Sequence, residues 1–121
     1  MNSTDMNLPT PPAGWQELLD LVCDNMEGVT PENIFEKTRK TDIVLARRMF
    51  CNLAKRTICR KLSQREIVEH MGDQWDDRSI LSYYEKCHRD QSKVNRKYRM
   101  FFKKLLNEAK QINLKLSRAA L

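Results

Sequence analysis

The sequence predicts an all-α fold: a compact helical domain that contains a helix-turn-helix and ends in a long C-terminal helix. Apolar residues recur at intervals of three and four along much of the chain, the period of one face of a helix. Glycine occurs only three times in 121 residues, and runs of β-branched residues are absent, so strands are disfavoured. With 40% hydrophobic and 31% charged residues, the chain can build one modest domain.

The first segment, residues 1–14, is polar and rich in proline, and it lacks the apolar region of a signal peptide. We expect a flexible tail there and a single helical domain over 15–121. The apolar side of the first expected helix consists of Trp15, Leu18, Leu19, Val22 and Met26. Gly28 ends this helix. Thr30-Pro31 then predicts one short helical turn, since threonine caps a helix and proline suits its first position.

A basic pair, Arg39-Lys40, precedes a long amphipathic run. The residues predicted on its buried side are Ile43, Ala46, Phe50, Leu53 and Thr57. Arginines and lysines occupy the other sides of the run. We therefore expect a long helix with one apolar stripe and a cationic flank.

Two shorter segments follow, and with the long helix they form the order of a helix-turn-helix at about residues 63–88. Ser63 and Glu66 have the spacing of a capping box, which predicts the start of a short helix. Gly72 suits the left-handed end of that helix, and Asp76-Asp77 offers cap oxygens for a second, recognition helix. The residues expected to face inward are Ile67, Val68, Met71, Ile80, Leu81 and Tyr84.

A last long helix is expected over 92–118, after a polar stretch at 88–97 that is either a loop or a bend. Its apolar stripe consists of Tyr98, Phe101, Leu105, Ala109 and Ile112. We expect this stripe to pack on the first helix and the long central helix as core; a homodimer seam through the C-terminal helix is the alternative. The opposite, basic side suits phosphates or a lipid surface.

Several of these residues resemble the C-terminal DNA-binding domain (domain IV) of the bacterial chromosomal replication initiator DnaA, which has a Trp-repressor-like helix-turn-helix. Lys37-Thr38-Arg39-Lys40 resembles the basic loop of that family, and residues 43–49 resemble the start of its long helix. Leu53-Ala54-Lys55 matches its L-A-K, and residues 76–82 resemble a degraded D-H-T-T-V-L-H motif. The resemblance implies sequence-specific binding of double-stranded DNA in replication or transcription regulation.

The sequence also departs from that family. Asp73-Gln74-Trp75 replaces the Gly-Gly-Arg that precedes the family's recognition helix, and Asp77 stands at the histidine position. In the family these positions read the initiator box, so we do not expect this chain to read the same DNA sequence. A bacterial or phage regulator with its own target is the expected role.

Charge is segregated along the chain. Residues 1–36 contain seven acids and no lysine or arginine, while all 22 basic residues lie in 37–121 with nine acids. These two parts carry net charges of −7 and +13, which give the +6 of the whole chain. A polyanion is the natural partner of the second part.

No pattern in the sequence indicates an enzyme. The G-x-x-x-x-G-K-[ST] loop of an ATPase is absent, and His70 and His88 have no nearby nucleophile in a catalytic pattern. The four cysteines, Cys23, Cys51, Cys59 and Cys87, form no C-x-x-C pair, so we expect neither a metal site nor a cofactor. Reduced thiols and the absence of a membrane-span pattern are typical of a cytoplasmic protein.

The residues expected at double-stranded DNA are Arg39, Lys40, Arg47, Arg48, Lys55, Arg78, Ser79 and Ser82. The loop pair would enter the minor groove or clamp phosphates. The two arginines of the long helix would hold the backbone or reach a guanine edge, and its lysine would add long-range attraction. On the recognition helix, the arginine would pair with guanine and the serines with a base or phosphate. Asp76 and Asp77 would act as caps, or one would accept from cytosine, although carboxylates also repel phosphate.

Two other functions remain open. A protein-interaction adaptor, on a helix-turn-helix scaffold that no longer reads DNA, would expose Trp75, Tyr83 and Tyr84 as one patch. RNA binding would use exposed aromatic rings to stack on unpaired bases. A buried Trp75, with the arginines of the loop and of both helices on one face, would favour DNA.

Overall fold

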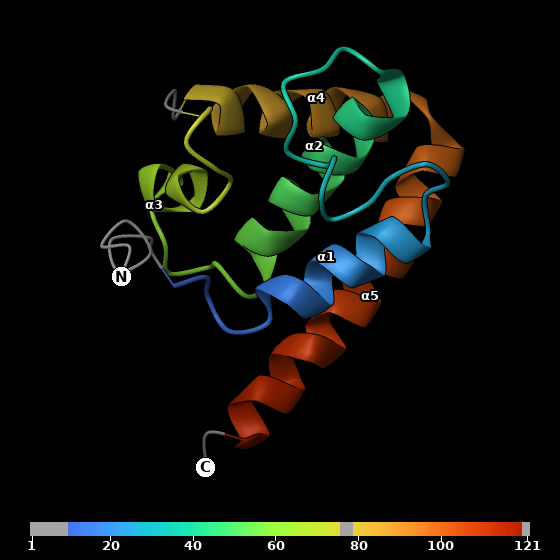
Figure 1. Ribbon diagram of the computed structural model, residues 1–121. Helices are drawn as coiled ribbons and strands as arrows, with labels where there is room; N and C mark the ends of the chain where they lie inside the picture. Colours follow the sequence, from blue (N-terminus) through green and yellow to red (C-terminus); the bar gives the residue numbers. More distant parts are fainter. Residues whose placement is uncertain (1–9, 76–78, 120–121) are drawn as a thin grey trace.

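The computed structural model describes residues 10–75 and 79–119, and these form five α-helices and no strand (Figure 1). The helices are α1 (Trp15–Asp24), α2 (Thr41–Arg56), α3 (Gln64–Glu69), α4 (Ser79–Val94) and α5 (Arg96–Ala119). The expected all-α class is therefore confirmed. No helix in this part of the chain has the length and apolar content needed to cross a membrane.

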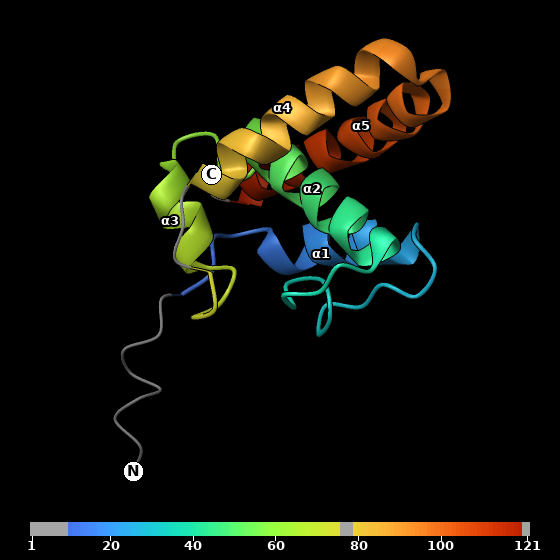
Figure 2. The same ribbon diagram turned by 90° about the horizontal axis from the view of Figure 1, so that it is seen from above.

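The central helix of the bundle is α2. It lies between α1 and α4, which both contact α2 but not each other (Figure 2). The helix α5 contacts α1, α2 and α4, and its C-terminal turns extend beyond the other helices (Figure 1). The expectation that the last helix packs on the first and on the long central helix is thus confirmed.

The middle of α2 is buried on almost every side, whereas the sequence predicted one buried stripe and a cationic flank. Each residue from Ala46 to Ala54, except the half-buried Arg48, is buried. Helices on three sides explain the difference, because they cover faces that a two-layer arrangement would leave in water. Phe50 has no exposed surface and meets the rings of Trp15 and Phe35 edge-on, at centroid distances of 4.8 and 5.5 Å.

The segment after α1 contains the single helical turn that was expected, because the Ile34 amide donates to the Thr30 carbonyl (3.0 Å), and this turn does not continue into a longer helix. Thr30 and Asn33 exchange hydrogen bonds: the Thr30 amide donates to Asn33 Oδ1 (2.8 Å), and the Asn33 amide donates to Thr30 Oγ1 (3.2 Å). This exchange closes the turn locally, and Ile34 and Phe35 are buried beyond it. The chain then reaches the basic residues before α2.

The start of α3 is formed by the predicted capping box. The Glu66 amide donates to Ser63 Oγ (3.2 Å), and the Ser63 amide donates to Glu66 Oε1 (3.1 Å). Gly72 has a positive φ of +122°, which favours glycine, but it does not cap α3 as expected, because His70 ends the helix in the right-handed conformation. At least six residues, 70–75, lie between α3 and α4, whereas a common helix-turn-helix has a turn of about three or four. The proposed caps Asp76 and Asp77 lie outside the described residues.

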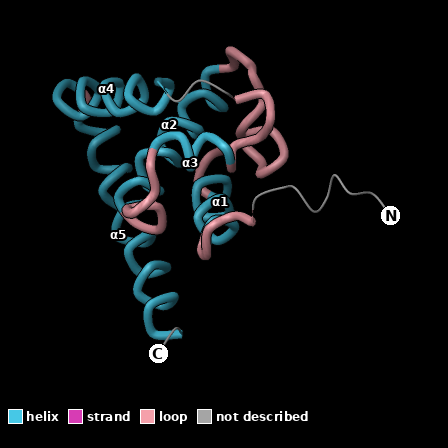
Figure 3. The backbone as a smooth tube through the Cα atoms, turned by 90° about the vertical axis from the view of Figure 1, so that its left-hand side faces the viewer, coloured by secondary structure: helices cyan, strands magenta, loops and turns pink. Residues whose placement is uncertain are grey.

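The last two helices are separated by a single residue, Asn95. Its side-chain oxygen accepts a hydrogen bond from the Tyr98 amide (3.0 Å), which caps the start of α5. The polar stretch that was expected as a loop or bend is therefore mostly helix, because α4 continues to Val94. The helices α4 and α5 lie together on one side of the molecule (Figure 3).

Candidate nucleic-acid interface

Arg47, one of the predicted DNA contacts, lies inside the protein with only 4% of its surface exposed. Its Nε donates to the Tyr84 hydroxyl (2.7 Å), and its Nη1 donates to the carbonyls of Ile34 (3.2 Å) and Glu36 (2.7 Å). The guanidinium also lies 4.6 Å from the centroid of the Trp75 ring. This placement does not fit the predicted role at DNA; Arg47 links α2 to α4 and to two turns.

Trp75 supports the same junction. Its Nε1 donates to the Phe35 carbonyl (2.6 Å), and the Gln74 side chain donates to the same oxygen (2.8 Å). Trp75 is therefore half-buried, Tyr84 is 2% exposed, and only Tyr83 is well exposed, at 52%. The three rings do not form the single exposed patch that the adaptor hypothesis requires.

The basic loop before α2 is exposed and borders a cleft of about 610 Å³ between α2 and α4. Arg39 and Arg48 line this cleft from one side, and Asp90 and Gln91 line it from α4. Lys40 lies instead at a second hollow, of about 500 Å³, whose lining includes the acids Glu27 and Asp42. Acidic neighbours therefore weaken the positive potential of this loop.

Arg48 is half-buried beside the cleft. Its guanidinium lies 5.5 Å from the Tyr83 ring and 5.9 Å from the Tyr84 ring, and its buried Nε has no hydrogen-bond partner. Arg48 and Arg39 thus share one wall of the cleft, and they are two predicted residues that the fold brings together.

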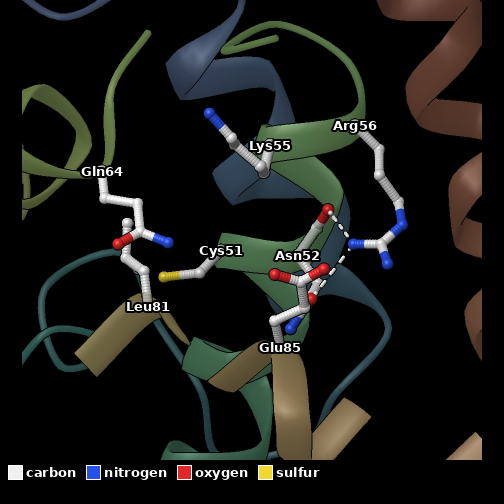
Figure 4. A pocket seen from close by; sticks show the side chains of 7 residues that line it. All are labelled: Cys51, Asn52, Lys55, Arg56, Gln64, Leu81 and Glu85. Atoms are coloured by element: carbon white, nitrogen blue, oxygen red, sulfur yellow. Dashed lines mark hydrogen bonds between the residues drawn. The ribbon is translucent and has the colours of Figure 1, made fainter. Parts of the chain in front are cut away.

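Lys55 lies at the other end of α2, about 24 Å from the basic loop for a helix of 16 residues. Its Nζ donates to the Leu62 carbonyl (2.6 Å) and so closes the turn after α2. Figure 4 shows it beside Arg56, at a pocket of about 290 Å³ that Glu85 lines from α4. The fold does not bring Lys55 together with Arg39.

The exposed side of α4 contains the two predicted serines and three cations that the prediction missed. Ser82, Lys86, Arg89 and Lys93 are exposed and recur at intervals of three and four, so they share one side of the helix, with Ser79 at its start. We call these four residues the α4 stripe. Ser82 exchanges hydrogen bonds with the Gln64 side chain of α3 (3.0 and 3.2 Å). Continuing the helical period beyond the family-like motif would have identified the three cations. Arg78 lies outside the described residues.

The α4 stripe and the basic loop lie on different sides of α4. Cys87 and Gln91 line the cleft beside the loop, and at about 100° per residue they point roughly 150° away from the middle of the stripe. Arg39, Arg47 and the stripe do not converge into one concave surface. The exposed cations of the basic loop and of the α4 stripe therefore form two separate groups, whereas the sequence predicted one shared surface.

The charges of the described helices follow the two sides of the molecule. Residues 79–119 contain eleven basic and three acidic residues, a net charge of +8, and every one of these cations is exposed. Residues 10–36 contain six acids and no base, and all six acids are exposed. Figures 2 and 3 show α4 and α5 on one side of α2 and α1 on the other. Within residues 10–75 and 79–119, the one ion pair joins Arg65 and Glu69, at 3.7 Å.

Three buried titratable groups, His88, Cys51 and Cys59, are neutral at pH 7. Burial and the nearby Arg56 lower the pKa of His88 to about 4, and its Nδ1 lies 2.7 Å from the Tyr98 hydroxyl. Burial raises the pKa of Cys51 to about 12 and that of Cys59 to about 11. These thiols therefore stay protonated, and a thiol is a far weaker nucleophile than a thiolate.

Metal-binding groupings are not found in the described chain: no three His, Cys, Asp or Glu side chains lie close enough to hold an ion.

Comparisons with protein-family models, with curated proteins and with solved structures give no significant match to this chain. We therefore infer the function from the charges and side chains of the exposed surface.

Proposed function

We propose that this protein binds double-stranded DNA through the α4 stripe. The observation that carries the proposal is the concentration of exposed and mostly unpaired cations on the α4–α5 side, opposite an acidic side formed by α1 and the following turn. Phosphates attract the first side and repel the second, so electrostatics alone would orient the protein on a duplex.

The α4 stripe suits a helix that lies along a groove. Lysine and arginine at intervals of three and four present charge on one side, and Arg89 has the planar donor pair that matches guanine O6 and N7. Lys86 and Lys93 would hold phosphates on either side of it. Ser82 adds a hydroxyl to the same side, near the start of the helix.

The basic loop does not belong to the proposed duplex interface. Arg39 is exposed at the cleft, and the hydrogen bonds of Arg47 to the Ile34 and Glu36 carbonyls fix the chain just before this loop. The cleft lies on a different side of α4 from the α4 stripe. The stripe would therefore both hold the backbone and read the sequence.

The resemblance to the DnaA domain suggests a cytoplasmic replication or transcription regulator of bacterial or phage origin. The sequence contains no phosphate-binding motif of an ATPase, so the proposed activity is binding alone. The adaptor alternative has no exposed aromatic cluster to support it, because Tyr84 is buried and Trp75 is half-buried.

Selection of bound sequences from random duplex DNA tests the proposal. The double variant Lys86→Ala/Arg89→Ala should bind more weakly and lose preference at one or two positions, because each bidentate pair with a base contributes about 1–3 kcal/mol of discrimination. The double variant Arg60→Ala/Lys61→Ala is the matched control, because it removes one arginine and one lysine from the exposed turn after α2. Equal effects of the two variants, or failure of the unmodified protein to bind duplex DNA, would contradict the proposal.

A further inference from the structure

The outer side of α5 forms a second cationic surface, and we propose that it binds the phosphate backbone of the same duplex, beside the segment held by α4. The helix α5 contains eight basic residues and one acid, Glu108, and all eight cations are exposed. This inference rests on the proposed function, since it adds a contact to the same ligand. The sequence left phosphates and a lipid surface open as ligands for the basic side of this helix, and the inference commits to the phosphates of the duplex.

Three of these cations form a row on the side of α5 that adjoins α4. Arg96, Lys103 and Lys110 recur every seven residues, so they share one side of the helix. Arg99 lies on that side too, and its guanidinium donates to the Ser92 carbonyl near the end of α4 (2.6 Å). We call Arg96, Lys103 and Lys110 the α5 row. The row and the C-terminal half of the α4 stripe are therefore neighbours.

The dimensions of the α5 row suit a phosphate backbone. Arg96 and Lys110 are fourteen residues apart, about 21 Å along a helix. Duplex DNA has one charge for about every 1.7 Å of its axis, so roughly a dozen phosphates lie within that length. The arginine and lysines of the row can hydrogen-bond phosphate oxygens, and so can the exposed Asn107, which lies between Lys103 and Lys110 on the same side.

A lipid surface fits the α5 row less well. An interfacial helix inserts a continuous apolar side into the lipid. In α5 that side packs in the core, where Phe102 is 6% exposed and Leu105 is fully buried. The large apolar side chains left exposed on α5 are Met100 and Leu114, which are fourteen residues apart.

The acidic side of a second copy fits the α5 row poorly as well. Such a contact would consist of exposed ion pairs, each contributing about 0–1 kcal/mol and screened by salt. A stable dimer needs apolar area in addition, and neither α1 nor α5 exposes a large apolar patch. Duplex DNA remains the partner with matching charge density.

The test compares two triple variants of the full chain. The variant Arg96→Gln/Lys103→Gln/Lys110→Gln removes the α5 row. The control variant removes the same charge from the side of α5 away from α4, by substituting glutamine at the exposed residues Lys97, Lys104 and Lys115. The affinity for a random-sequence duplex of about 25 base pairs is measured by fluorescence anisotropy over a range of salt concentrations.

Loss of the α5 row should make the slope of log K against log salt shallower by about 2.7, at about 0.9 for each of three phosphates, while the control changes the slope by less than about 0.9. Both variants replace exposed side chains, so their thermal midpoints should match that of the unmodified protein. Equal slope changes would indicate diffuse attraction and overturn the inference, as would unchanged slopes in both.

The outcome separates this inference from the proposed function. If Lys86→Ala/Arg89→Ala weakens binding but loss of the α5 row does not, α4 binds DNA and the inference about α5 fails alone. If the unmodified protein does not bind the duplex, the proposed function fails. Binding to phosphatidylserine vesicles that depends on the α5 row, with unchanged DNA binding, would assign the row to lipid and overturn the inference.

Discussion

Replacement of Arg47 by methionine separates a structural role from a role at DNA. The substitution keeps an apolar stem of similar length but removes three hydrogen bonds, to the Tyr84 hydroxyl and to the Ile34 and Glu36 carbonyls. Hydrogen bonds from charged groups contribute about 1.5–3 kcal/mol each. The Glu36 carbonyl is near the surface and regains water, so we expect a net decrease of about 3 kcal/mol in unfolding free energy. At roughly 4 °C per kcal/mol, the midpoint should fall by about 12 °C.

Urea unfolding, followed by circular dichroism, measures the decrease in unfolding free energy, and a thermal scan measures the fall in midpoint. The matched control is Arg48→Met, on the next residue. Arg48 is half-buried and its buried Nε has no partner, so its replacement should cost less than about 1 kcal/mol. At temperatures where both variants are folded, Arg47→Met should bind duplex DNA with nearly unchanged affinity. If Arg47→Met keeps full stability and binds DNA tenfold more weakly, the interior role assigned to Arg47 is wrong.

Three further substitutions test the fold. Gly14→Ala should lower the unfolding free energy by about 1–3 kcal/mol in urea titrations, because Gly14 has a φ of +87° and a Cβ would lie 2.7 Å from Leu116 Cδ1 and 2.8 Å from Ile58 Cγ2. Ser63→Ala should lower it by about 1 kcal/mol, since the helix cap is removed; an unchanged urea midpoint would refute the cap. His88 has a pKa of about 4 when folded and about 6.5 when unfolded, so the unfolded chain binds the extra proton and stability should fall from pH 6.5 to pH 4. His88→Gln should show a smaller fall in thermal midpoint over that range, and an equal fall would contradict the assignment.

Features set by neighbouring residues could be predicted from the sequence. The capping box at Ser63 depends on residues three apart, and the positive φ of Gly72 depends on one residue's freedom from a Cβ. The buried residues of α1 follow from helical period, and so does the burial of Ile67 and Val68 in α3. Local rules were sufficient for these elements.

Features set by tertiary contacts could not be predicted. An arginine on an amphipathic helix is usually exposed. The residues next to Arg47 in the sequence do not indicate that Trp75 covers it, or that carbonyls eleven and thirteen residues away accept its hydrogen bonds. The separation of the basic loop from the α4 stripe likewise depends on a tertiary feature, the orientation of α4 about its own axis where it packs on α2. The cations of α4 beyond Ser82 were missed because the family-like motif ends there.

The account depends most on the claim that the α4 stripe is a phosphate-binding surface, and the salt dependence of duplex binding by the unmodified protein tests it most directly. Its three cations predict a slope of log K against log salt of about −2.7 or steeper, from about 0.9 for each phosphate. The three cations of the α5 row would make the slope about −5. A slope near zero, or a slope that Lys86→Ala/Arg89→Ala leaves unchanged, would contradict the account.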